Sequence, residues 1–222
     1  GETFYLKKKN LDIYFNQVEA LIKSKNQLEA MKKIGNILNI DSNSKRAYYL
    51  KGALYFELND TIKAIQNFNK AVSLDEKCAQ SYFERAYCFN YFGYQDRALS
   101  DYNIAISLDS TNALYYRKRG NLFLELYDNI HACLKDYKLG LKYDSSSTIM
   151  TNIGRLYNGS NLKFNNIDSA HYWFKLGVKY AGNDEYPLVS YAEFLNEINE
   201  IKEALKYINM AISIKKNYNG LV

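Results

Sequence analysis

Hydrophobic and polar positions along the chain follow the period of an amphipathic helix. In residues 64–74 the apolar side chains fall at positions i, i+1, i+4, i+7, i+8 and i+10: Ala64, Ile65, Phe68, Ala71, Val72 and Leu74. Such a stripe covers one face of a helix. Residues 48–58 carry a second broad apolar face, and Asn59-Asp60 between the two stretches predicts a turn. The pattern therefore predicts two helices joined by a short turn.

This helix pair recurs along the chain. Segments 67–75, 101–109 and 136–144 share one order: an aromatic residue, a small residue three positions later, then apolar, polar, apolar and Asp. The place of the small residue returns at spacings of 34, 34, 35, 37 and 34, at Ile37, Ala71, Ala105, Gly140, Gly177 and Ala211. Recurrence at this period is typical of stacked helical repeats.

We therefore predict an all-α fold, a right-handed α-solenoid of about six helix-turn-helix repeats that forms a single domain over residues 11–218. The expected repeats are 11–44, 45–78, 79–112, 113–147, 148–184 and 185–218. Residues 1–10 are assigned to an N-terminal extension and residues 219–222 to a C-terminal tail.

Small residues on each first helix should let the paired axes approach closely. Three such residues are expected to face small residues of the second helix: Gly52 with Ala64, Ala86 with Ala98, and Gly120 with Cys133. The polar stretches 41–44, 110–112 and 145–147 lie between repeats, where their side-chain oxygens can accept from the first N–H groups of the next helix. These stretches are predicted N-caps.

The repeated motif resembles that of the tetratricopeptide repeat family. The family's pattern W-x2-L-G-x2-Y followed by A-x3-F is met in modified form, once as Tyr48…Lys51-Gly52…Tyr55 with Ala64…Phe68, and again in the two following units. The family's proline after the second helix is replaced by Ser or Glu. Residues 150–184 resemble the related Sel-one-like variant, because segment 154–159 is followed by a longer connection before segment 168–177.

The resemblance implies a non-catalytic protein-interaction scaffold. In such repeats the first helices line a concave groove that holds an extended peptide or a partner helix. The residues expected in this groove are Tyr49, Phe56, Phe83, Tyr87, Asn90, Tyr91, Arg117, Asn121, Glu125 and Asn152. They would suit a segment with apolar and acidic groups. The alternative is that the aromatic rings only pack between adjacent first helices.

Other functions are open to the same repeats. Tyr207 and Met210 lie outside the apolar stripe predicted to face their own first helix, so the last helix could mediate self-association as a homodimer. Single-stranded RNA binding is a weaker alternative, since Tyr and Lys are plentiful but most Lys residues belong to second helices. A carboxylate clamp like the family's is not expected, because the third helix lacks cations near Tyr186 and Ser190.

Composition narrows the class of protein. Of 222 residues 47% are hydrophobic and 24% charged, which argues against disorder, and a single proline suits consecutive helices. The net charge of +5 is spread too evenly to indicate a nucleic-acid binder. The two histidines, His131 and His171, belong to separate repeats, and no catalytic motif is present. We expect no enzyme, no cofactor, no metal and no small-molecule substrate.

The three cysteines lack CxxC spacing and are expected to be small buried hydrophobes. No stretch of about 18 apolar residues predicts a membrane span. The compartment is not determined by the sequence: the chain would be soluble, cytoplasmic or exported if a leader peptide has been removed.

Overall fold

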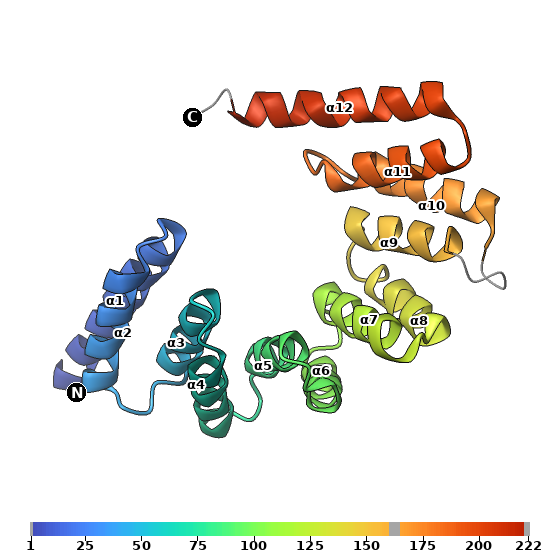
Figure 1. Cartoon of the computed structure of the whole chain (residues 1–222). Coiled ribbons are helices and arrows are strands. Elements are labelled where there is room, and N and C mark those ends of the chain that lie inside the picture. The colour runs from blue at the N-terminus through green and yellow to red at the C-terminus, as the bar shows by residue number, and fades with distance from the viewer. Residues whose placement is uncertain (1, 160–164, 220–222) are drawn as a thin grey trace. The chain divides into compact units, whose positions relative to one another are not determined.

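The computed structural model describes residues 2–159 and 165–219, of which the side chains of residues 2–10, 127 and 216–219 are left undescribed. Within this part the chain is built from helices without a strand (Figure 1). The twelve helices are α1 (Glu2–Lys23), α2 (Gln27–Ile40), α3 (Lys45–Glu57), α4 (Thr61–Leu74), α5 (Ala79–Tyr91), α6 (Gln95–Leu108), α7 (Ala113–Tyr127), α8 (Ile130–Gly140), α9 (Ser147–Tyr157), α10 (Ile167–Lys179), α11 (Tyr186–Glu197) and α12 (Ile201–Asn219). The predicted all-α class and helix-turn-helix repeat are confirmed.

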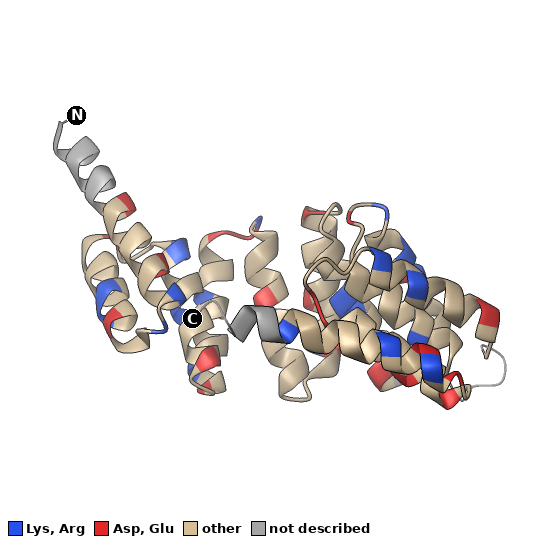
Figure 2. Ribbon diagram, turned by 90° about the horizontal axis from the view of Figure 1, so that it is seen from above, with Lys and Arg blue, Asp and Glu red and all other residues tan. Residues whose placement is uncertain are grey.

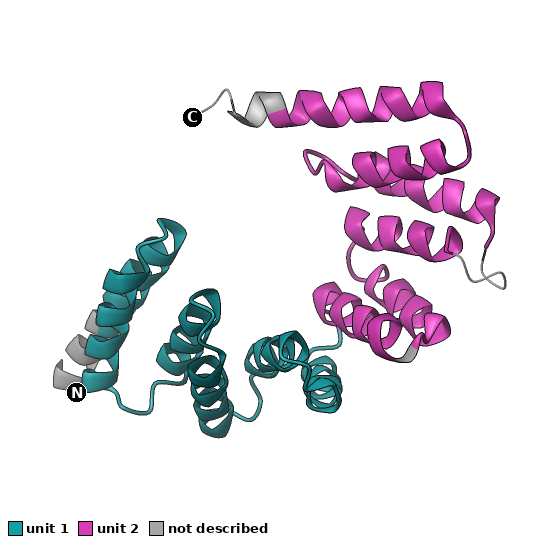
Figure 3. Cartoon of the chain, in the orientation of Figure 1, with its two compact units in different colours: residues 1–110 teal, residues 111–222 magenta. Residues whose placement is uncertain are grey.

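The chain divides into two compact units, residues 1–110 and residues 111–222 (Figure 3). In unit 1 the helices pair as α1 with α2, α3 with α4, and α5 with α6, and each pair contacts the next. In unit 2 the pairs are α7 with α8, α9 with α10, and α11 with α12, and these pairs also contact in order. Consecutive helix pairs therefore stack within each unit, as the repeat predicts, while cooperative folding of all six repeats as a single domain stays a prediction.

The ends of the repeats differ in part from the expected boundaries. Helix α1 begins at Glu2, inside the segment that was assigned to an N-terminal extension. The predicted tail falls almost entirely outside the described residues. The connection from Tyr157 to Ile167 is the long one expected in the fifth repeat, although residues 160–164 within it are also outside the description.

Helix starts follow the polar residues between and within repeats. The side chain of Asn112 accepts from the N–H of Leu114 at 3.1 Å, and that of Ser146 accepts from Ile149 at 3.4 Å. Ser44 occupies the N-cap of α3 without a side-chain hydrogen bond. The predicted caps are therefore present, two of them with the expected hydrogen bond.

Glycine on the first helix permits close packing of the second, but against a different neighbour from the predicted one. A Cβ atom on Gly52 would lie 3.0 Å from ring carbons of Phe68, and one on Gly120 would lie 2.9 Å from the ring of Tyr137. The nearest group is thus an aromatic ring of the second helix. For Gly52 this ring is that of Phe68, whereas the prediction was Ala64. Because glycine has no side chain, the ring can pack directly against the first helix.

Two buried ion pairs each join the two helices of one repeat. Arg85 Nε and Nη2 donate to the two carboxylate oxygens of Asp101 at 2.6 and 2.8 Å, joining α5 to α6. Arg119 donates to both oxygens of Asp136 at 2.7 Å, joining α7 to α8. Both carboxylates are almost fully buried, and the bidentate geometry compensates for their lost hydration.

Candidate functional site

The first-helix residues predicted to form one groove fall in both units, and each unit is described by itself. In unit 1, Phe56 of α3 contacts two residues of α5: its ring centroid lies 5.3 Å from that of Tyr87 and 5.7 Å from that of Tyr91. Tyr91 is 62% exposed. The three rings form an aromatic cluster between two adjacent first helices, as the alternative describes, and the cluster reaches the surface at Tyr91.

The other predicted residues of unit 1 are more deeply packed. Phe83 is only 4% exposed and lies against Tyr102, so its assignment to a ligand groove is wrong because the second helix covers it. The half-buried Tyr49 ring packs on Phe68, and its hydroxyl donates to Glu84 at 3.5 Å. Burial raises the pKa of Tyr49 to about 12. Both rings pack on second helices, Tyr49 on α4 and Phe83 on α6, whereas the alternative placed such rings between adjacent first helices. Asn90 is half-buried on α5.

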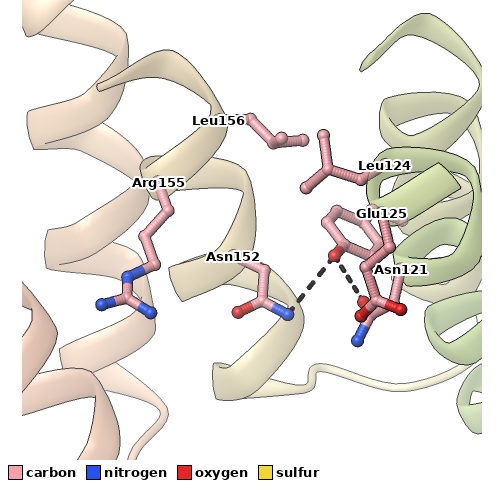
Figure 4. Close-up of a pocket in the computed structure, with 7 residues that line it drawn as sticks. Asn121, Leu124, Glu125, Asn152, Arg155 and Leu156 are labelled. Carbon is pink, nitrogen blue, oxygen red and sulfur yellow. Dashed lines mark hydrogen bonds between the residues drawn. The ribbon is translucent and has the colours of Figure 1, made fainter. Parts of the chain in front are cut away.

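In unit 2 three of the four predicted residues come together. Asn121 and Glu125 of α7 and Asn152 of α9 line one cavity of about 250 Å³ (Figure 4). Arg117 does not line it. Leu124 and Leu156 also border the cavity, with their side chains facing each other. The cavity therefore combines an apolar part with polar groups from two successive first helices.

A chain of hydrogen bonds orients the two asparagines. The hydroxyl of Tyr137, from α8, donates to Asn121 Oδ1 at 2.6 Å, and Asn152 Nδ2 donates to the same hydroxyl at 3.5 Å. Tyr186 of α11 donates to Asn152 Oδ1 at 2.8 Å. Burial raises the pKa of Tyr137, so its hydroxyl stays protonated and able to donate. The amide of Asn121 is thereby fixed with its NH₂ group unpaired among the described residues.

A cation and two carboxylates complete the site. Arg155 Nη2 lies 3.0 Å from Glu193 Oε2, and both side chains are 53% exposed. Arg155 Nη1 also donates to the hydroxyl of Tyr186 at 3.5 Å. Glu125 is exposed and forms no ion pair with another described residue. An ion pair at this exposure is weak, so Arg155 can exchange Glu193 for another anion.

Sequence reasoning missed Arg155, although the repeat contained a signal for it. Asn121 follows the small residue Gly120 directly, and Arg155 follows Gly154 in the next first helix. The two therefore occupy the same position of successive repeats, and Glu193 follows Ala192 in the same way. Tyr137 could not have been found by that rule, because it comes from a second helix.

The last helix differs from the prediction. Tyr207 was expected outside the packed stripe, but its ring lies 4.7 Å from that of Tyr191 on α11 and is half-buried. Met210 is 42% exposed, as expected. A different apolar stripe runs along α12, at Ile201, Leu205, Ile208 and Ile212, and a cavity of about 260 Å³ lies between it and α11.

The described part of the chain offers few side chains for metal binding or catalysis. There, no three His, Cys, Asp or Glu side chains are grouped so that they could hold a metal ion. His171 Nδ1 lies 2.7 Å from the hydroxyl of Tyr191, and His131 is exposed on α8. The thiols of Cys88 and Cys133 are buried, as predicted, while Cys78 is half-buried. None of the described helices is long and apolar enough to cross a bilayer.

Comparison with known proteins identifies the repeat. The tetratricopeptide repeat family model matches residues 45–78, which are the bounds predicted for the second repeat. No curated protein sequence matches the chain.

Solved structures show the same fold over most of the chain. PilF of Pseudomonas aeruginosa is 14% identical, with a TM-score of 0.78 over 96% of this chain and 94% of its own. PilW, described as a type IV pilus biogenesis factor, is 14% identical, with a TM-score of 0.73 over 89% of this chain and 90% of its own. YrrB, described as a TPR protein with an unusual peptide-binding site, is 14% identical, with a TM-score of 0.57 over 82% and 92%.

Similarity at this identity establishes the fold, and the family match establishes the repeat. The chain therefore contains a tetratricopeptide repeat at residues 45–78 and has the fold of tetratricopeptide-repeat proteins.

Proposed function

We propose that the chain is a protein-interaction scaffold and that unit 2 binds an extended segment of a partner in the cavity between α7 and α9. One observation carries this proposal: an oriented donor, a free acceptor and an exposed cation meet in one cavity. These are the NH₂ group of Asn121, the carboxylate of Glu125 and the guanidinium of Arg155.

The groups match the chemistry of an extended backbone. A peptide offers carbonyl and N–H groups in alternation, and Asn121 can donate to a carbonyl while Glu125 accepts from an N–H. Since Tyr137 already holds the Asn121 amide, little rotamer entropy is lost when that bond forms. Leu124 and Leu156 can cover an apolar side chain.

The same arrangement favours an acidic residue in the partner. Arg155 is paired only across an exposed contact, and a planar guanidinium can hold a carboxylate with two parallel hydrogen bonds. We therefore expect a segment with one acidic and one apolar side chain. The peptide-binding site named for YrrB is compatible with this use of the fold, although that site belongs to YrrB alone.

A synthetic peptide array tests the proposal. Ten-residue peptides that combine Leu or Phe with Asp or Glu are screened against the full chain, and bound members are measured by fluorescence anisotropy. Asn121→Ala should weaken binding about two- to thirteenfold, since one hydrogen bond contributes about 0.5–1.5 kcal/mol. Arg155→Ala should remove the preference for acidic peptides.

The matched controls are Arg117→Ala, on the same helix but outside the cavity, and Asn209→Ala on α12. Both should bind as the parent chain does. Peptides that bind equally well to the Asn121→Ala and Arg155→Ala variants would show that this cavity is not the site.

We propose self-association through α12 as a second candidate function. The proposal rests on comparing the exposure of equivalent residues in two second helices, α4 and α12. Val72 and Ile212 each follow the small residue of a second helix, but Val72, with α5 packed against its helix, is 7% exposed and Ile212 is 46% exposed. The cavity beside this apolar face is bordered by the acidic Glu193 on α11. The basic Lys202 follows Ile201, which lines the cavity on α12. A second copy would meet this apolar face with opposite charges at its rims.

A further inference from the structure

An apolar groove lies in unit 1 where two hairpin turns come together. It has a volume of about 510 Å³. The turn between α3 and α4 and the start of α4 contribute the apolar Leu58, Ile62 and Ile65 beside the polar Asn59, Asp60 and Thr61, and the turn between α5 and α6 contributes Phe92 and Tyr94. We call the groove that these five apolar residues form the turn groove.

Its position follows from the local chain geometry. Each turn contains a left-handed residue, Asn59 with φ 58° and Gly93 with φ 76°, that reverses the chain in a few residues. Because the repeat period places the two turns in neighbouring hairpins, their apolar residues lie side by side.

The turn groove leaves much apolar surface in water. Ile62 is 73% exposed, Tyr94 52% and Leu58 50%. The ring of Phe92 lies 4.8 Å from that of Tyr91, which belongs to the aromatic cluster of Phe56, Tyr87 and Tyr91. Single exposed apolar residues are ordinary, but a contiguous group of this size indicates a contact surface.

The charged groups at the groove are the ion pair of Asp60 with Lys63 and the guanidinium of Arg97, which follows Asp96 in the chain. Asp60, at the start of α4, is paired with Lys63 at 2.7 Å, and the hydrogen bond from Lys63 holds the pKa of this carboxyl below its usual value. Arg97 lies with its guanidinium 5.6 Å from the ring centroid of Tyr94 and 5.9 Å from that of Phe89. Arg97 is exposed, and none of the ion pairs between described residues includes it.

We propose that the turn groove binds a segment of a partner protein in which a large apolar side chain stands next to an acidic one. The apolar side chain enters between Ile62 and Tyr94, and the carboxylate pairs with Arg97, which stays stacked on the Tyr94 ring. The complementarity of one unpaired cation beside an apolar groove selects this partner. This site is separate from the cavity of unit 2, and its proposal does not depend on that function.

A nucleic acid fits the same groove poorly. Affinity for a phosphate backbone comes from several cations that each replace counterions, and the turn groove has one unpaired cation beside its apolar side chains. A single-stranded oligonucleotide is therefore a useful competitor in the test.

The probe is an array of twelve-residue peptides with Phe, Leu, Ala or Ser at the centre and Asp, Asn or Lys as its neighbour. We expect the Phe-Asp and Leu-Asp peptides to bind the full chain, with amide shift changes in NMR spectra at the turn groove. Ile62→Ser should weaken their binding at least tenfold. Arg97→Glu should weaken the Asp peptides at least fivefold and reverse the preference toward the Lys peptides.

The controls match each change in exposure and type. Leu28→Ser alters an apolar residue that is 86% exposed on α2, and Lys70→Glu reverses an exposed charge on α4. Both should bind like the parent chain, as should Asn121→Ala in unit 2. Circular dichroism checks that all variants keep their helicity, which is expected because Ile62 and Arg97 are exposed.

Four results would overturn the proposal. The first is that no peptide of the array binds, and the second is that binding survives Ile62→Ser. The third is a loss of binding in Asn121→Ala alone, which would place the peptides in unit 2 instead. The fourth is that Ile62→Ser changes only the sedimentation of the free chain, or only the binding of a poly-uridine oligonucleotide, since the occupant would then be a second copy or RNA.

Discussion

At the scale of single residues, Gly177 and Gly35 both lie inside helices but in opposite surroundings. A Cβ atom on Gly177 would come within 2.5 Å of Thr151 Oγ1 and within 3.3 Å of backbone atoms of α9. A Cβ atom on Gly35 would meet nothing within 4 Å. The first glycine is needed for the packing of α10 on α9, whereas the second has no steric role.

We predict that Gly177→Ala lowers the free energy of unfolding by about 1–3 kcal/mol, because the backbone of α9 must move to admit a methyl group. Gly35→Ala should raise it by about 0.5–1 kcal/mol, because alanine loses less conformational entropy in a helix. Urea unfolding followed by circular dichroism measures both. Equal effects of the two substitutions would contradict the packing described for α9 and α10.

The repeat also lets some site residues be read from the sequence. Asn121 and Glu125 were expected on the first-helix face because the period assigns them to it, and both line the cavity. Phe83 was expected there for the same reason but is buried. Periodicity gives the face of a helix, while the burial of a ring depends on which neighbouring helix covers that face.

At the scale of the helix pair, two equivalent positions, one on each helix, form an ion pair in some repeats and an aromatic contact in another. Arg85 and Asp101 form the buried ion pair of the third repeat, and Arg119 and Asp136 that of the fourth. In the sixth repeat the corresponding positions hold Tyr191 and Tyr207, whose rings are in contact. In these three repeats the two helices are in contact at this level, through an ion pair in two of them and through two rings in the other.

Removing one member of a buried pair should be costly. Asp136→Asn leaves the Arg119 guanidinium without its compensating charge, and we expect a loss of about 3–5 kcal/mol in the free energy of unfolding. Glu19→Gln is the matched control, because the pair of Glu19 with Arg46 is exposed and should change stability by less than about 1 kcal/mol. Urea unfolding compares them, and a loss of under 1 kcal/mol for Asp136→Asn would contradict this role.

At the scale of the whole molecule, charge is distributed rather than concentrated. Figure 2 shows Lys and Arg interspersed with Asp and Glu along the described helices of both units. A field of this kind favours specific contacts at defined sites over general attraction to polyanions. The candidate surfaces accordingly have individual cations at their edges, Arg97 in unit 1 and Arg155 in unit 2.

Self-association would be a property of the whole molecule, and sedimentation velocity over a range of concentrations measures it. We expect the parent chain to form a dimer and the double variant Leu205→Lys with Ile212→Lys to sediment as one chain, because two buried cations would oppose the apolar contact. Leu28→Lys, at a more exposed apolar position on α2, is the control and should remain dimeric. A parent chain that stays a single chain at all concentrations would exclude this function.

The sequence alone determined the helical class, the period and the bounds of the second repeat, because these depend on the local spacing of apolar residues along the chain. It also assigned Asn121, Glu125 and Asn152 to one face. Only the tertiary structure decided that Tyr137 orients the asparagines, that Arg97 stands beside an apolar groove and that Tyr207 is packed against Tyr191. These relations join different helices, and their distances depend on how close the helix axes lie, which the period of a single helix does not specify.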